Sequence, residues 1–283
     1  MGKRILNKEK ILGDVRKTYR DTYDTNNLDL IEQVFNDVTD LFAGRMAGYT
    51  RCDTRYHDLV HTLQVVQPFI EIIDGINKSG HHLKLSKYYF DIGIIAVLLH
   101  DTGYIKTEAD TTGTGGKYTF AHIQRSIDFA ERYLSGIGLA HEAVAGVKNI
   151  IMCTGVVIDY RTLPFNSEEE RILGYALGTA DLLGQMSDPD YYEKLPSLYS
   201  EFEEAYHFEG IDTLRKKGVR IFTSAEDLIR STPQFYEVVV KDRFKKLGNL
   251  HMYMTYHFND SNNPYIRAIE ENIEKIRQMP ASQ

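Results

Sequence analysis

The chain of 283 residues contains no tryptophan and only two cysteines, Cys52 and Cys153. Two cysteines provide no disulfide framework, which favours a reducing compartment. The seven prolines are scattered, so no proline-rich linker divides the chain. The longest uninterrupted apolar run, residues 92–99, is far too short to cross a bilayer. These absences predict a cytoplasmic protein without membrane spans.

The sequence also lacks an apolar leader and an excess of positive charge. Residues 1–7 contain no apolar stretch of the kind that a signal peptide needs, and Leu6 stands where the myristoylation pattern requires serine or threonine. The net charge of -7 argues against broad binding to nucleic acid or to anionic membranes. We therefore expect neither nucleic acid nor a membrane among the partners.

What the chain does contain is helical periodicity, and strand alternation is nowhere sustained. Apolar residues recur at steps of three and four along residues 28–46, which is typical of one amphipathic helix. Ser86 is a candidate N-cap for a buried helix over residues 87–100, and Ser167 with three following glutamates caps another. Asn263 and Pro264 are expected to begin the last helix.

The same patterns predict further helices over residues 57–73, 120–134, 140–154, 191–207, 211–217, 225–229 and 234–258. We predict an all-α fold, with a helical domain over residues 26–207. A C-terminal helical extension over residues 208–283 is expected to pack on the same domain. Its aromatic residues are assigned to core packing, to closing a pocket or to a homodimer contact.

The polar pair His100-Asp101 ends the apolar run of residues 92–99. Two polar side chains at the end of a core helix are costly to bury unless something binds them. A divalent metal ion is the simplest partner, because neutral imidazole and carboxylate together suit such ions. The pair therefore predicts a metal site.

Three more residues extend this set. On a helix, His57 and His61 would share one face, so that one ring binds a metal and the other faces a substrate. Asp181 is set among Thr179, Ala180, Leu182 and Leu183, and buried aspartates are rare unless they are paired. Core packing or helix capping accounts well for any single histidine, but it accounts poorly for the whole set.

The order His61, His100-Asp101 and Asp181 resembles the H…HD…D signature of the HD superfamily of metal-dependent phosphohydrolases. The segment from Tyr56 to His61 is similar to the Tyr-His-Asn-x-x-His motif of the cyclic-nucleotide phosphodiesterase branch, with Asp58 in place of the asparagine. The resemblance covers roughly residues 50–190, and it implies the all-helical HD-domain bundle.

The resemblance implies that His61, His100, Asp101 and Asp181 bind the first metal ion and that Asp101 bridges to a second. It implies one or two divalent ions, drawn from Mn, Mg, Fe, Ni, Co and Zn. Two ions about 3.5–4 Å apart clamp the attacking and leaving oxygens of an in-line displacement. His57 takes the position of the general acid that protonates the leaving alkoxide.

His122 resembles the third histidine of HD proteins with an extended ligand set, but no histidine occurs over residues 150–154, where the fourth should fall. This departure disfavours a diiron oxygenase site. His122 either faces the substrate, supports the metal ligands from outside, or packs in the core. Cys153 is assigned to core packing, because a thiolate suits soft metals. Tyr104 replaces the lysine of HD proteins that cleave cyclic dinucleotides, which argues against that class.

Three basic residues and one loop lie near these motifs in the sequence, and each has two possible roles. Lys106, Lys117 and Arg125 could neutralise phosphate oxygens or lie on the solvated surface. The Gly/Thr-rich residues 110–116 form either a lid or an ordinary exposed loop.

The hypothesis from sequence is a phosphohydrolase, either a phosphodiesterase or a phosphomonoesterase, acting on a small nucleotide-like phosphoester. The alternative is a regulatory nucleotide-binding protein with little or no activity, which would need no general acid at His57.

Overall fold

The computed structural model describes residues 8–25, 27–80, 84–155 and 158–279. Within these residues helices are joined by loops without a β-strand, and a single isolated bridge pairs Tyr49 with Thr107, so the all-α prediction is confirmed. The α-helices are α1 (Lys8–Tyr23), α2 (Asp29–Phe42), α3 (Leu59–Lys78), α4 (Lys87–Leu99), α5 (His122–Gly136), α6 (His141–Met152), α7 (Glu168–Met186), α8 (Tyr191–Glu209), α9 (Ile211–Lys216), α10 (Ala225–Phe235), α11 (Lys241–Lys246), α12 (Met254–Phe258) and α13 (Pro264–Arg277).

Helix α4 lies at the centre of the bundle, because it is apolar on nearly every side. It contacts α2, α3, α6 and α7, and every residue from Ile92 to Leu99 is buried. Gly93 allows this close packing, since a Cβ atom there would lie 2.8 Å from the Phe69 ring and 2.9 Å from Leu173. Burying α4 in this way fixes where its C-terminal end, and the residues that follow, must lie.

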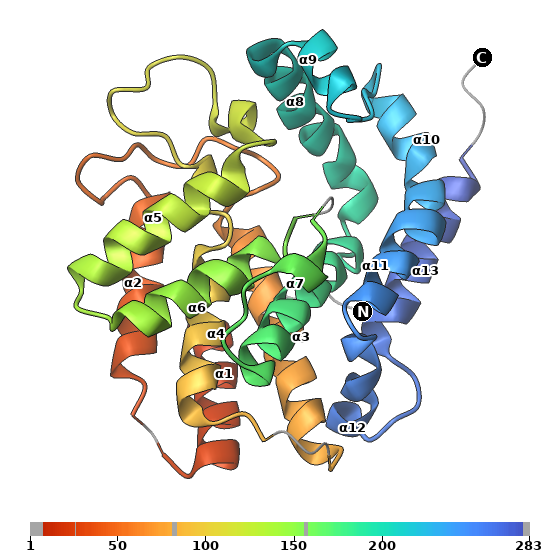
Figure 1. Ribbon diagram of the computed structural model, residues 1–283. Helices are drawn as coiled ribbons and strands as arrows, with labels where there is room; N and C mark the ends of the chain where they lie inside the picture. The colour runs from red at the N-terminus through yellow and green to blue at the C-terminus, as the bar shows by residue number, and fades with distance from the viewer. Residues whose placement is uncertain (1–7, 26, 81–83, 156–157, 280–283) are drawn as a thin grey trace.

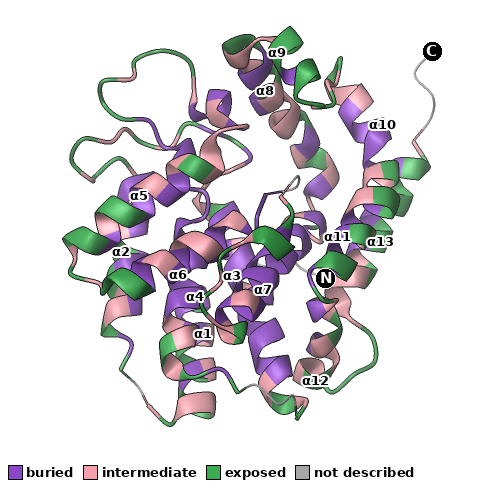
Figure 2. Ribbon diagram, in the orientation of Figure 1, coloured by how far each residue is buried: buried purple, intermediate pink, exposed green. Residues whose placement is uncertain are grey.

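Helices α8, α10 and α13 pack on one another to one side of this central group, with α13 against α7 (Figure 1). Helix α3 runs along α7, α5 packs on α6, and α1 packs on α3. Buried residues gather on α3, α4 and α7, whereas exposed residues lie on the outer helices (Figure 2). One hydrophobic cluster extends from Ile11 in α1 to Ile276 in α13. The domain limits 26–207 and 208–283 stay a prediction, although α1 precedes them and joins the same core.

All three predicted residues stand at helix starts, and two of them make the capping hydrogen bond. The Ser167 hydroxyl accepts a hydrogen bond from the backbone N–H of Glu170 at the start of α7. Asn263 accepts from the N–H groups of the residues that begin α13, and Pro264 occupies the first helical position. Ser86 stands at the N-cap of α4 without a side-chain hydrogen bond. Capping residues therefore located these boundaries from sequence.

Two predicted elements are wrong. His57 does not lie on a helix with His61, because Asp58 caps α3 and its carboxylate accepts the N–H of His61 at 2.9 Å. The single helix expected over residues 234–258 is broken, since Gly248 and Asn249 have φ angles of 73° and 53°. Left-handed backbone cannot continue a right-handed helix, so the chain turns between α11 and α12.

Helix α1 was not expected from the sequence, yet it buries Ile11, Val15 and Tyr19. None of the described helices combines the length and the apolar character that crossing a membrane would require. The prediction made for residues 1–7 lies outside the described part of the chain.

Candidate metal centre

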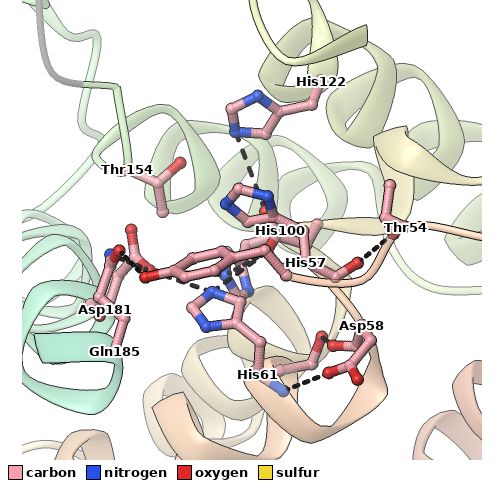
Figure 3. A network of polar contacts seen from close by, with 12 residues as sticks. Thr54, His57, Asp58, His61, His100, His122, Thr154, Asp181 and Gln185 are labelled. Carbon is pink, nitrogen blue, oxygen red and sulfur yellow. Dashed lines mark hydrogen bonds and ion pairs between the residues drawn. The ribbon is translucent and has the colours of Figure 1, made fainter. Parts of the chain in front are cut away.

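Two histidines and two aspartates meet between the start of α3, the end of α4 and the middle of α7 (Figure 3). The Nε2 atom of His61 lies 3.3 Å from Oδ2 of Asp101 and 3.4 Å from Oδ1 of Asp181. The Nε2 atom of His100 lies 3.3 Å from the same Asp101 oxygen and 4.0 Å from the same Asp181 oxygen. The structure thus brings together the four residues expected to form the first metal site.

The end of α4 aims the His100-Asp101 pair inward. Because α4 ends at Leu99, the chain turns through His100 and Asp101 into a 3₁₀ turn, Thr102–Tyr104. Gly103 is required in this turn, since a Cβ atom there would lie 2.0 Å from the carbonyl oxygen of His122. His100 and Asp101 are 1% and 2% exposed, so their polar atoms depend on partners inside the protein.

When the His100 ring is neutral, its hydrogen bond to the backbone leaves two acceptor atoms facing each other, Nε2 of His100 and Oδ2 of Asp101. Nδ1 of His100 lies 2.7 Å from the carbonyl oxygen of Val97, which can only accept, so Nδ1 carries a hydrogen. In the neutral ring, Nε2 then presents a lone pair to the Asp101 carboxylate. Nε2 of His100 and Oδ2 of Asp101 have no hydrogen-bond partner among the described residues. A cation between them satisfies both atoms, and the donor set of imidazole and carboxylate fits a divalent metal ion.

Without a metal ion, protons occupy the same position. Burial alone would lower the pKa of His61, but the carboxylates of Asp101 and Asp181 raise it to about 10. Burial would raise the pKa of Asp101, but His100 and His61 hold it well below its usual range. The buried Asp101 and the partly exposed Asp181 therefore demand positive charge, and the imidazoles supply it in the metal-free protein.

His57 is held beside this cluster by Glu201 of α8. Nδ1 of His57 lies 2.6 Å from Oε2 of Glu201, and both side chains are largely buried. The other carboxylate oxygen accepts the backbone N–H groups of Arg55 at 3.1 Å and of Tyr56 at 2.7 Å. The Thr54 hydroxyl donates to the carbonyl oxygen of His57 at 2.6 Å. His57 is therefore fixed by bonds to its ring and its backbone, although it lies outside α3.

His122 opens α5 and faces the cluster from another side (Figure 3). Its Nδ1 lies 2.7 Å from the carbonyl oxygen of Thr119, and its Nε2 lies 3.9 Å from Oδ1 of Asp101. Burial lowers the pKa of His122, so its ring is neutral near pH 7 and its Nε2 lone pair faces the Asp101 carboxylate. Of the roles left open for His122, this geometry favours one at the metal site over core packing.

Several aromatic and amide side chains surround the cluster. The Tyr104 ring stacks on His57 at 4.4 Å and on His122 at 4.7 Å between ring centroids. The Tyr56 hydroxyl donates to Gln185 Oε1 at 3.1 Å, and the Gln185 amide donates to Asp181 at 3.4 Å. Asp181 is thus tied through Gln185 to the segment that carries His57.

The three basic residues considered for phosphate binding form ion pairs and hydrogen bonds within the protein. Lys106 pairs with Asp53 at 2.9 Å, and Lys117 pairs with Asp110 at 2.6 Å. The Arg125 guanidinium donates to the carbonyl oxygens of Gly103 and Ile105. These three cations therefore hold the loops around the site.

The residues 110–116 are tied to the body of the protein rather than free. The Thr114 N–H and hydroxyl donate to Glu204 of α8, and the Gly115 N–H donates to Asp53 at 2.7 Å. A closing lid needs freedom that these bonds remove, which favours the ordinary loop over the lid.

Cys153 is fully buried in the core, as expected, and burial raises the pKa of its thiol to about 12. Thr154 rather than a histidine stands at the edge of the cluster on the α6 side (Figure 3).

Glu201 and Tyr104 are the residues that sequence reasoning missed as parts of the site. Glu201 lies in an acidic stretch with Glu203 and Glu204, which is typical of a solvated helix face, and it is 144 positions from His57. No local pattern signals such a distant contact. Tyr104 does follow the His-Asp pair closely, so its proximity was a usable signal.

Comparisons with known proteins support the fold. Residues 162–255 match the family described as Npun_R2479-like. No curated protein matches the sequence. The structure is similar to the phosphodiesterase domain of the RhoPDE fusion protein from the choanoflagellate Salpingoeca rosetta, with a TM-score of 0.52 and 13% identity. The match covers 99% of this chain and 96% of that chain, and it shows a phosphodiesterase-like helical fold.

Proposed function

We propose that the protein is an HD-type, metal-dependent phosphohydrolase that cleaves a phosphoester of a nucleotide or a related small molecule. The observation that carries the proposal is the pair of buried acceptors, Nε2 of His100 and Oδ2 of Asp101, beside the His57–Glu201 pair. The first pair calls for a cation, and the second is suited to proton transfer. The named activity of the structural neighbour agrees with this reading.

His61, His100, Asp101 and Asp181 would hold the first divalent ion. Asp101 and His122 present a further pair of acceptors for a second ion, 3.9 Å apart. A bound divalent ion supplies Lewis acidity, which polarises phosphoryl oxygens and lowers the pKa of water. The pKa values of both carboxylates are lowered by the neighbouring histidines, so they are ionised and would lose no proton on accepting the ion.

His57 would deliver a proton to the leaving oxygen. Glu201 accepts the Nδ1 hydrogen, so Nε2 is the ring atom that would carry the transferable proton. An alkoxide leaves poorly without a proton, which is why a phosphoester hydrolase needs such a donor. Tyr56 and His61 contact the His57 ring at its edges and limit its movement.

A second function is favoured by one geometric fact. His57, His61 and Asp101 each offer one ligand atom, and these three atoms lie within 4.8 Å of one another. His57 is therefore placed to bind a metal ion as well as to act as a general acid. A protein that uses His57 as a ligand lacks the proton donor. It would be a regulatory nucleotide-binding protein with little or no turnover.

The test is a panel of phosphomonoesters and phosphodiesters, including nucleotides, assayed with Mn²⁺, Mg²⁺, Ni²⁺, Co²⁺ and Fe²⁺. We expect metal-dependent hydrolysis of at least one class, with Asp101→Ala as the inactive blank. Inactivity across the whole panel would favour the regulatory function. Two irons per chain together with oxygen consumption would instead establish an oxidase.

A further inference from the structure

Tyr104 is buried against the two histidines that lie outside the four expected ligands of the first metal ion, His57 and His122, whose own ring centroids are 6.2 Å apart. Its side chain is 2% exposed and sits in the 3₁₀ turn directly after the His100-Asp101 pair. The ring planes of Tyr104 and His57 differ by 8°, and those of Tyr104 and His122 by 20°. The three rings are thus held nearly parallel beside the candidate metal centre. The proton transfer and metal binding described above do not involve Tyr104.

The turn that carries Tyr104 is rigidly held. The Gly103 N–H donates to the Ser126 hydroxyl at 2.8 Å, and the Arg125 guanidinium binds carbonyl oxygens on both sides of Tyr104. Gly115 packs against the Tyr104 carbonyl so closely that a Cβ atom there would lie 2.0 Å from its oxygen. The tyrosine ring is therefore a fixed surface.

His57 needs such a surface. Its bond to Glu201 fixes the Nδ1 atom, and Tyr56 and His61 meet the ring in T-shaped contacts, but none of these contacts lies flat against the imidazole to oppose a tilt of its plane. Flat contact with a fixed ring removes this tilt and determines where Nε2 points. A proton donor must lie within hydrogen-bond reach of its target, so small tilts are costly to the reaction.

We propose that Tyr104 is a positioning residue whose ring sets the plane of the His57 imidazole for proton delivery. This inference rests on the proposed function. It assigns the task to the aromatic face and not to the hydroxyl group. Tyr104→Phe should therefore retain the function of the site, whereas Tyr104→Leu and Tyr104→Met should impair it.

The experiment compares two substrates that differ in their need for a proton. Both substrates are of the class, monoester or diester, that the panel finds to be hydrolysed. The alkyl phosphoester requires protonation of its leaving oxygen, whereas the p-nitrophenyl phosphoester releases a stable anion that hardly needs it. We expect kcat of Tyr104→Leu and Tyr104→Met to fall by on the order of 10–100-fold on the alkyl ester. On the p-nitrophenyl ester kcat should change by less than about threefold, and KM should stay unchanged for both.

The ratio of the two kcat values is the decisive quantity, because both are measured on one preparation and the ratio is independent of the folded fraction. Phe90→Leu is the matched control, since Phe90 is a fully buried aromatic residue in contact with Tyr19 and Tyr23. It should lower thermal stability and leave the ratio unchanged.

The inference is overturned if Tyr104→Leu and Tyr104→Met keep the wild-type ratio, or if Tyr104→Phe shifts the ratio as they do. A wild-type protein that hydrolyses no phosphomonoester and no phosphodiester contradicts the proposed function itself. If His57→Ala changes the ratio and the Tyr104 variants do not, the proposed function stands and only the role of Tyr104 fails.

Discussion

Helix α3 carries two clusters of histidine and aspartate, and they differ in how their charges are balanced. At its start, His61 meets Asp101 and Asp181, and buried acceptor atoms remain without partners. Near its end, Asp74 is paired with His257 at 2.5 Å and with Lys78 at 2.6 Å. Among the ion pairs of the described residues, a lysine thus faces a carboxylate of the second cluster, whereas only histidines face the carboxylates of the first.

This difference separates a candidate site from structural ion pairing. Burial would raise the pKa of Asp74, but His257 and Lys78 lower it, so the carboxylate is satisfied by its own neighbours. In the first cluster the two carboxylates face only imidazoles, and Nε2 of His100 lies 3.3 Å from Asp101 while its Nδ1 donates to the carbonyl oxygen of Val97. Counting donors against acceptors therefore identifies the metal centre better than residue type does.

The largest expected effect comes from removing the shared carboxylate of the first cluster. Asp101→Ala should reduce kcat/KM by on the order of 10³-fold or more, because the metal ion contributes several kcal/mol of charge stabilisation. Asp74→Ala should change kcat/KM by less than about threefold, since Asp74 contacts none of the candidate ligands. Steady-state kinetics on the best substrate of the panel measure both. If both variants lose kcat/KM to the same extent, the two clusters do not differ in function as we propose.

Next in size is the loss of the proton donor. His57→Ala should keep its bound metal and lose on the order of 10²-fold or more of kcat on alkyl phosphoesters, because the leaving alkoxide is then unprotonated. Metal content per chain and kcat are measured on the same sample. If the variant loses metal in proportion to activity, His57 is a ligand and the regulatory function gains support.

A smaller effect is the pH dependence of metal binding. His61 must be neutral to bind a metal ion, yet Asp101 and Asp181 raise its pKa to about 10 in the metal-free protein. Binding at about pH 8 should therefore release a proton, and affinity should rise by about tenfold per pH unit below pH 10. Calorimetry of Mn²⁺ binding in two buffers of different ionisation enthalpy measures the release. Heats that do not depend on the buffer would contradict a protonated His61.

The smallest expected effect concerns the second cluster. Asp74→Asn should cost about 1 kcal/mol of unfolding free energy near neutral pH, or about 2–4 °C in Tm. The lowered pKa of Asp74 means that its stabilisation is present above about pH 4 and is lost as the pH falls through the folded value. Thermal unfolding at several pH values should show the gap between wild type and variant closing in acid. A gap that widens in acid would refute this pairing.

The sequence predicted the parts of the fold that depend on local patterns. Ser167 and Asn263 were located as caps because their side chains bond to nearby backbone N–H groups. The single helix expected over residues 234–258 failed because Asn249 adopts a left-handed conformation within an otherwise helical pattern.

For the candidate site, the sequence predicted which side chains would gather but not what holds them. His100, Asp101 and Asp181 stand out in the sequence as polar residues among apolar ones, and His61 was added by its spacing from His57 and by the resemblance to the H…HD…D signature. Glu201 was not found, because its contact with His57 depends on how α8 packs and not on any neighbouring residue. The position of His57 was missed for a local reason, since Asp58 offered a recognisable N-cap.

The central claim is that the first cluster of α3 requires a divalent cation and the second does not. Equilibrium dialysis against Mn²⁺, followed by metal analysis, tests it on the wild type, Asp101→Asn and Asp74→Asn. We predict one or two Mn²⁺ ions per chain in the wild type and in Asp74→Asn, and a loss of binding in Asp101→Asn. A wild type that binds no divalent metal, or an Asp101→Asn variant that binds as much as the wild type, would contradict the account.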